Sequence, residues 1–282
     1  MIPTLYYHDN TPIALFGGAY GNVPALKACF EDARQQGAEL RVFLGDATGC
    51  CGHSDAVIDL LLERCQVHIA GNHEVQAVAG ALTCGCGYGS VEDERLSCAA
   101  HAYAMQSLRD DQRTRLATWP QVGLIDTPQG RLLLCHGSPD QNNEFLYEST
   151  LDEARLGRWL EAANARGLIC THTGLPWIRH LADGRFAVNA GVVGKPDHDG
   201  DPAVHYAMLR WTDGQAHIDI RRVAYDHDTW TDQMTAAGIE DVFVEPLRTG
   251  WWTVGVASLP PAEQARDQRP RVLRPRAPMA TP

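Results

Sequence analysis

Four segments of the sequence place a side chain capable of binding a metal directly after an apolar run. These segments are Leu44-Gly45-Asp46, Ala70-Gly71-Asn72-His73-Glu74, Cys135-His136-Gly137 and Cys170-Thr171-His172. Because strand ends of an open α/β sheet converge on one crevice, we expect one carboxylate, one amide and two imidazoles to meet there. This mixed set of oxygen and nitrogen ligands suits Zn, Mn or Fe better than Ca or Mg. A single His or Asp at a strand end is more often a cap or a satisfied polar group, so the metal prediction depends on four occurring in order.

Strands and helices alternate along the part of the chain that carries the first two motifs. The runs 13–16, 41–44 and 66–70 are typical of buried strands, and the segments between them have apolar residues at helical spacing. This order predicts parallel strands with right-handed crossovers. The stretch from Val78 to Ser90 is rich in Gly and Cys and predicts an irregular loop beside the site. Further helices are expected at 93–116 and 151–165, and further strands at 121–125, 131–135, 167–170, 185–189, 205–211 and 216–223.

The composition is typical of a globular protein. A chain of 282 residues with 44% apolar residues fills the core of one large α/β domain or two small ones. The net charge of -11 disfavours attraction to nucleic acid or to an anionic membrane. No stretch approaches a membrane span, and the first residues lack a signal-peptide pattern, so we expect a cytoplasmic protein. The odd count of nine cysteines favours free thiols or metal ligands over a disulfide framework.

The successive motifs Gly45-Asp46, Gly71-Asn72-His73-Glu74, His136-Gly137 and His172-Thr173 resemble the signatures of the calcineurin-like metallophosphoesterases. The later run from Val188 to Pro196 is similar to the segment that follows in the small bacterial phosphodiesterase and phosphatase branch. The resemblance covers residues 12–230. It implies a four-layer αββα sandwich, in which two mixed β-sheets lie face to face with helices outside, and a metal centre that hydrolyses phosphate esters. We expect one domain at 1–258 and a partly disordered tail at 259–282.

The resemblance also implies a role for each matching residue. Asp46 corresponds to the carboxylate that bridges two metals, and Asn72, His136 and His172 complete the shell of the second metal. His73 matches the residue that helps to bind phosphate and protonates the leaving oxygen. A metal there makes water more acidic and offsets phosphoryl charge, and an imidazole supplies the proton. We therefore expect at least one Mn, Fe or Zn ion per chain.

The ligands that belong only to the first metal are missing. Gly18-Ala19-Tyr20-Gly21-Asn22 stands where the family has Asp-x-His-Gly-Asn, and Thr171-His172-Thr173-Gly174 lacks the final His of Gly-His-x-His. One explanation is an enzyme with one metal. A second explanation is that other residues replace the lost ligands, and the candidates are Cys84, Cys86, Tyr20 and the Cys50-Cys51-Gly-His53 segment. The alternative interpretation of the cysteines is that their thiols pack a tight loop. For Tyr20, the alternative is that its ring fills the space of a lost metal. A third is a protein that binds but does not hydrolyse.

The prediction is a metal-dependent phosphoric ester hydrolase, a phosphatase or phosphodiesterase acting on a small phosphorylated substrate. The metal ligands are Asp46, Asn72, His136 and His172, and His73 is the acid. The alternative is a catalytically weakened member of the fold that binds a phosphorylated ligand or a protein partner. A third class is a thiol-dependent metal protein centred on Cys84 and Cys86. The oligomeric state and the natural substrate stay open, because loops above a shared centre decide the substrate.

Overall fold

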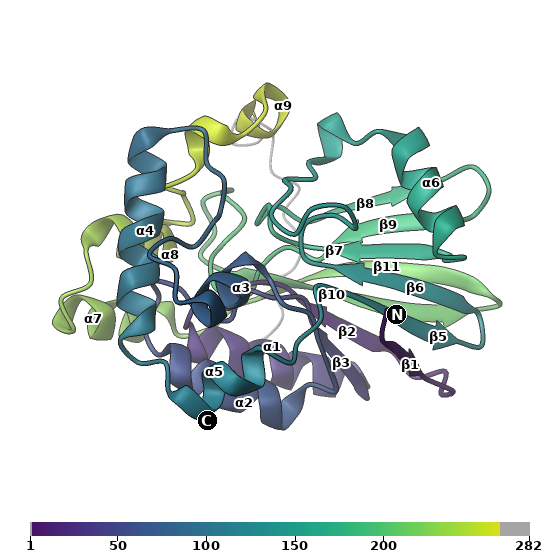
Figure 1. Cartoon of the computed structure of the whole chain (residues 1–282), viewed down its shortest axis with the longest axis horizontal. Helices are drawn as coiled ribbons and strands as arrows, with labels where there is room; N and C mark the ends of the chain where they lie inside the picture. Colours follow the sequence, from purple (N-terminus) through teal and green to yellow (C-terminus); the bar gives the residue numbers. More distant parts are fainter. Residues whose placement is uncertain (1, 266–282) are drawn as a thin grey trace.

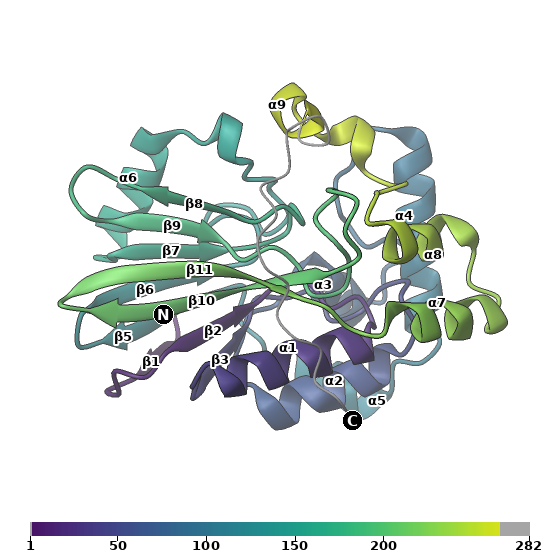
Figure 2. The ribbon, with the colours of Figure 1, turned by 180° about the vertical axis from the view of Figure 1, so that it is seen from behind.

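The apolar runs of the sequence form two mixed β-sheets in a computed structural model that describes residues 2–265 (Figures 1 and 2). The five-stranded sheet has the order β11-β10-β2-β3-β4. Its parallel strands β2, β3 and β4 confirm the predicted crossovers, and β10 pairs antiparallel with both β2 and β11. The bounds of its strands are β2 Ile13–Phe16, β3 Leu40–Phe43, β4 Val67–His68, β10 Val204–Thr212 and β11 Gln215–Val223.

The six-stranded sheet has the order β1-β5-β6-β7-β9-β8. Strands β5 and β6, both predicted from the sequence, pair antiparallel, and β7 lies parallel to both β6 and β9. Strands β1 and β8 at the two edges have no counterpart in the sequence prediction. The bounds are β1 Thr4–Tyr6, β5 Val122–Thr127, β6 Gly130–Cys135, β7 Gly167–Cys170, β8 Trp177–His180 and β9 Phe186–Asn189.

Alternation of side chains along each strand divides the core into layers. Ile13 and Leu15 of β2 pack against Leu132 and Leu134 of β6, so these residues join the two sheets. The intervening residue Ala14 faces helices α1 (Val23–Gln35) and α2 (Ser54–Arg64). On the far side, α6 (Glu153–Ala162) covers the six-stranded sheet. This four-layer arrangement of two mixed sheets flanked by helices confirms the predicted fold class.

Several helices lie beyond the strand ends, where they surround the site. In Figure 1, α3 lies centrally at the ends of the strands, and α4 and α8 lie further out on the same side. No helix of the described residues is long and apolar enough to cross a bilayer. The bounds are α3 Asn72–Ala79, α4 Val91–Met105, α5 Asp110–Leu116, α7 His227–Ala236, α8 Asp241–Thr249 and α9 Pro261–Gln264, with 3₁₀ turns at Glu148–Thr150 and Val256–Ser258.

The structure differs from the sequence prediction mainly around α3. The helical region expected at 93–116 is two helices, α4 and α5, and α3 was not predicted. The signals for α3 were a Glu three residues after Gly71, which is typical of a helix start, and Gly80, which adopts the left-handed conformation at its end. Of the expected tail, Leu259 is buried and α9 is helical, whereas 266–282 lies outside the described residues.

Candidate metal centre

Asp46 is presented by a tight turn directly after β3. Gly45 and Asp46 both have positive φ, of 100° and 67°, and positive φ is uncommon outside glycine. The fully buried carboxylate of Glu74 holds this turn, since it accepts hydrogen bonds from the backbone N–H groups of Asp46, Ala47 and Gly71 at 2.7, 2.7 and 2.8 Å. Glu74 lies within one of the sequence motifs, but the motif by itself does not indicate this role. A glutamate at this helix start therefore positions the side chain of Asp46.

His136 follows β6 and is completely buried. Its Nδ1 donates a hydrogen bond to the carbonyl of Leu44 at 2.7 Å, so the lone pair of the neutral ring lies on Nε2. Nε2 lies 3.2 Å from Oδ2 of Asp46 and 3.0 Å from Nδ1 of His172. Burial lowers the pKa of His136, but the charge of Asp46 and its hydrogen bond outweigh burial, so the pKa is raised. The ring is thus oriented by its second nitrogen, as metal-binding histidines usually are.

His172 follows β7 and also has positive φ, of 68°. Backbone strain of this kind concentrates at functional sites. Burial, followed by the neighbouring charge of His136, lowers the pKa of His172 to about 3. Burial alone would raise the pKa of Asp46, but His136 and His73 reverse this effect, and the pKa of Asp46 is lowered well below its usual range. Asp46 is therefore a carboxylate and His172 a neutral imidazole over the ordinary pH range.

Asn72 is the first residue of α3, and hydrogen bonds donated by Nδ2 orient its side-chain amide. Nδ2 donates to the carbonyl of Cys84 at 2.8 Å and to Sγ of Cys86 at 3.4 Å. Oδ1 is buried and has no hydrogen-bond partner among the described residues. The backbone N–H of the next residue, His73, donates a hydrogen bond to Oδ1 of Asp46 at 3.2 Å. This bond places the start of α3 against the carboxylate of Asp46.

These contacts bring the predicted ligands together in a set that fits a metal ion. The ligand atoms of Asp46, His136 and His172 all lie within 4.8 Å of one another and are buried. A buried amide oxygen without a partner, such as Oδ1 of Asn72, is costly unless a cation or water satisfies it. Two imidazole nitrogens and a carboxylate that face one another form a donor set suited to Zn, Mn or Fe.

His73, the expected acid, is oriented by the carbonyl of Thr48. Its Nδ1 donates to that oxygen at 2.6 Å, and its Nε2 lies 3.8 Å from Oδ2 of Asp46. The side chain is 8% exposed and lines the pocket described below, so it can reach a ligand there. The ring of His73 is thus oriented through Nδ1, and its side chain borders the pocket.

The ring of Tyr20 packs against two glycines, Gly18 and Gly194. A Cβ added at Gly18 would lie 2.6 Å from Cζ of Tyr20, and one at Gly194 would lie 2.6 Å from Cδ2 of the same ring. The ring centroid is 5.8 Å from that of His73. Burial, followed by the charge of Asp46, raises the pKa of Tyr20 well above its usual value. The position of Tyr20 therefore favours the space-filling interpretation over the ligand interpretation.

Cys84 and Cys86 lie in the loop between α3 and α4 and are joined by a disulfide. The expectation of free thiols is wrong for this pair, because the loop brings their Cα atoms to 5.5 Å, within the range of a disulfide. The expectation of free thiols agrees with the state of the other seven cysteines. In the disulfide state neither sulfur is a thiolate ligand.

Asp46, His73 and His172 line a pocket. Lys195 provides the only Lys or Arg among the described residues that line it, and its Nζ lies 3.7 Å from the ring centroid of Trp252. Burial lowers the pKa of Lys195 to about 8, although the charges of nearby cysteines and of Asp46 oppose this shift. The opposite wall is largely apolar and comes from α4, α8 and the segment after α8: Ala100, Val242, Phe243, Pro246, Leu247 and Val254.

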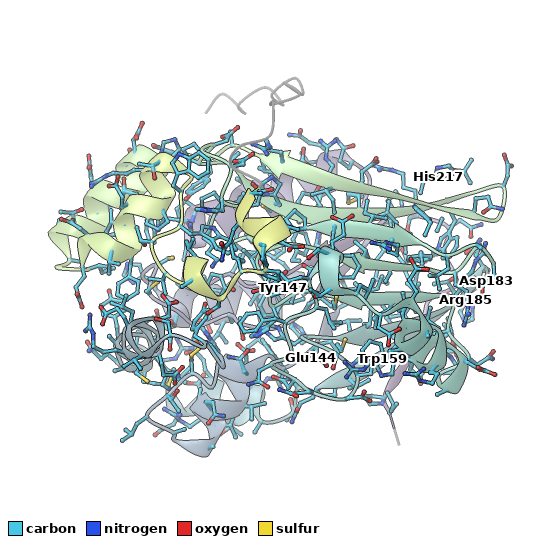
Figure 3. The ribbon with its side chains drawn as sticks, turned by 90° about the horizontal axis from the view of Figure 1, so that it is seen from above. Glu144, Tyr147, Trp159, Asp183, Arg185 and His217 are labelled. Carbon is cyan, nitrogen blue, oxygen red and sulfur yellow. A yellow bond between two sulfur atoms is a disulfide. The ribbon has the colours of Figure 1, made fainter. Side chains whose placement is uncertain are left out.

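Glu144 follows the loop of His136 but points elsewhere. Its carboxylate accepts hydrogen bonds from Arg155 on α6 and from Ser138. Figure 3 shows it near Trp159, whose ring lies 4.4 Å from the guanidinium carbon of Arg155. Glu144 therefore stabilises the loop after β6 by joining it to α6.

No protein-family model matches the sequence, and no curated protein matches it significantly. Solved structures do match. A metallophosphoesterase from Sphaerobacter thermophilus is 22% identical, with a TM-score of 0.67, over 86% of this chain and 100% of that chain. The hypothetical protein PH1004 from Pyrococcus horikoshii OT3 is 17% identical, with a TM-score of 0.68, over 86% of this chain and 99% of that chain.

The chain thus has the metallophosphoesterase fold, as the sequence resemblance predicted. Within this fold it brings Asp46, His136 and His172 together, and the ring of Tyr20 lies against Gly18.

Proposed function

We propose that this protein is a metal-dependent hydrolase of small phosphomonoesters or phosphodiesters that uses one metal ion. The observation that carries the proposal is the convergence of Asp46, His136 and His172, two of which, Asp46 and His172, line a pocket. The buried Oδ1 of Asn72 is unsatisfied and is available as a further ligand. A Mn, Fe or Zn ion bound by these four residues supplies Lewis-acid chemistry, which makes water more acidic and offsets phosphoryl charge.

Side chains of the protein would supply the proton and offset the charge of the substrate. Thr48 holds the ring of His73 through Nδ1, which leaves Nε2 to carry the proton that the leaving oxygen takes. The ammonium of Lys195 attracts the phosphate and offsets part of its charge. Burial of the site strengthens both interactions, because electrostatic attraction increases when water is excluded.

The shape and polarity of the pocket favour a substrate with one phosphate and an apolar group. A single Lys opposes a wall of Phe243, Leu247 and other apolar side chains, so a polyphosphate would lack cationic partners there. An alkyl or aryl group esterified to the phosphate would instead bury apolar area against α8.

A panel of esters tests this proposal after metal loading. We expect turnover of 4-nitrophenyl phosphate or bis(4-nitrophenyl) phosphate, and a higher kcat/KM for phenyl phosphate than for glycerol phosphate. Exchange of Leu247 for Asp should reduce this preference while metal content stays constant. Equal kcat/KM for the aryl and the glycerol ester would contradict the substrate class.

The second candidate is a binding protein of the same fold without catalysis. The packing of Tyr20 over Gly18 favours it, since this arrangement removes the space and the ligands of a first metal. Two-metal sites stabilise both the attacking and the leaving oxygen. One bound metal equivalent with no turnover of any ester in the panel would support the binding protein and reject the hydrolase.

A further inference from the structure

A second group of ligand-type atoms adjoins the proposed metal site. The Nε2 of His73 and the sulfurs of Cys84 and Cys86 belong to a buried set whose ligand atoms lie within 4.8 Å of one another. None of the three residues is a ligand of the site formed by Asp46, Asn72, His136 and His172. The disulfide between the two cysteines prevents both sulfurs from acting as thiolate ligands in the state described here.

The Nε2 atom of His73 lies near a disulfide sulfur and a carboxylate oxygen. Because Nδ1 donates its proton to Thr48, the lone pair of the neutral ring lies on Nε2. This nitrogen lies 3.3 Å from Sγ of Cys86 and 3.8 Å from Oδ2 of Asp46. Neither a disulfide sulfur nor a carboxylate oxygen carries a proton, so neither contact gives the Nε2 lone pair a hydrogen-bond donor.

We propose that reduction of the Cys84–Cys86 disulfide creates a second metal site, in which two thiolates and Nε2 of His73 bind one divalent cation such as Zn²⁺. Two cysteines and one histidine with an open fourth position form a known type of zinc ligand set. The donated hydrogen bond from His73 to Thr48 is the kind of contact that orients a metal-binding imidazole. Two thiolates also balance the charge of the cation.

The chemistry of the switch is a two-electron exchange. A dithiol reductant transfers two electrons and two protons to the disulfide, the S–S bond breaks, and the reductant leaves as its own disulfide. The thiols of Cys84 and Cys86 then release their protons when the cation binds. Gly85 and Gly87 flank Cys86 with φ values of 66° and 80°, so the loop is built from residues that adopt these conformations without a steric cost.

Occupation of this second site would control hydrolysis. While Nε2 of His73 binds a cation, it cannot carry the proton for the leaving oxygen. The oxidised protein should therefore hydrolyse faster than the reduced protein loaded with metal. This consequence rests on the proposed function, whereas the existence of the second site does not.

Metal stoichiometry tests the proposal without an activity assay. A chelator first removes metal from the full chain. One sample is then loaded with Co²⁺ in its oxidised form. A second sample is reduced with a dithiol, separated from the reductant under anaerobic conditions and loaded with Co²⁺. We expect one Co²⁺ per chain in the oxidised form and two in the reduced form. The second equivalent should add a near-ultraviolet band from charge transfer between thiolate and cobalt.

Matched variants locate this additional ion. Cys84→Ser and Cys86→Ser should each lose the second equivalent and the thiolate band and keep the first equivalent, whereas Cys98→Ser on α4 should keep both. His136→Ala should lose the first equivalent and keep the thiolate band, which separates failure of this proposal from failure of the proposed function. One equivalent in the reduced wild type, or a thiolate band that persists in Cys84→Ser, would overturn the second site.

Discussion

Exchange of Glu74 for Gln tests whether this carboxylate holds the turn that presents Asp46. Oε2 accepts from the amides of Asp46 and Gly71, and Oε1 accepts from the amide of Ala47. In the variant one oxygen becomes an NH₂ group. This group cannot accept a hydrogen bond, and it would face a backbone donor.

The expected loss of stability follows from these three bonds. One buried amide loses its partner, at a cost of about 1–3 kcal/mol, and the other two bonds lose the charge of their acceptor, at a cost of about 1 kcal/mol each. Because Gln avoids part of the cost of burying a charge, we expect a net loss of about 2–4 kcal/mol in the free energy of unfolding. Displacement of Asp46 should also weaken metal binding by about 10- to 100-fold, as is typical for changes behind a metal ligand.

Urea unfolding of the metal-free protein and calorimetric titration with Zn²⁺ or Mn²⁺ measure the two effects separately. Glu161→Gln on the exposed side of α6 is the matched control, and its unfolding free energy should change by less than about 0.5 kcal/mol. A Glu74→Gln protein with the stability and metal affinity of the wild type would refute this reasoning.

Three further substitutions test the site and the core. His136→Ala should remove the metal and all hydrolysis of bis(4-nitrophenyl) phosphate. His217→Ala, on β11 and far from the site, should change neither (Figure 3). Undiminished turnover in His136→Ala would disprove the site. The pKa of Lys195 is lowered to about 8, so its positive charge disappears as the pH rises through that value. The KM for bis(4-nitrophenyl) phosphate should therefore increase above about pH 8 in the wild type but not in Lys195→Met, and parallel pH profiles would exclude this role. Asp32→Asn removes the charge of a carboxylate that accepts two hydrogen bonds from the guanidinium of Arg221. The free energy of unfolding, measured by urea denaturation, should fall by about 1–3 kcal/mol. An unchanged unfolding midpoint would show that this ion pair does not contribute to stability.

The sequence by itself determined the strands that carry the site and the identity of the proposed ligands. Apolar runs followed within two residues by a polar side chain that can bind metal are a local signal. Strands β6 and β7 are parallel neighbours, so His136 and His172 follow strands that end at the same edge of one sheet. Asp46 follows β3 of the other sheet, and its meeting with the two histidines depends on how the two sheets pack together. Helix α3 was missed because its first residues were interpreted only as a motif, although Glu74 and Gly80 are start and stop signals.

Only the tertiary structure decided how these residues are oriented and what fills the space of the missing ligands. The tautomer of His136 depends on the carbonyl of Leu44, which is 92 positions away in the sequence, and no local pattern contains that contact. The position of the Tyr20 ring over Gly18 likewise follows from packing against Gly194. Orientation and packing depend on distances between distant segments, and such distances are fixed only when the sheets and helices assemble.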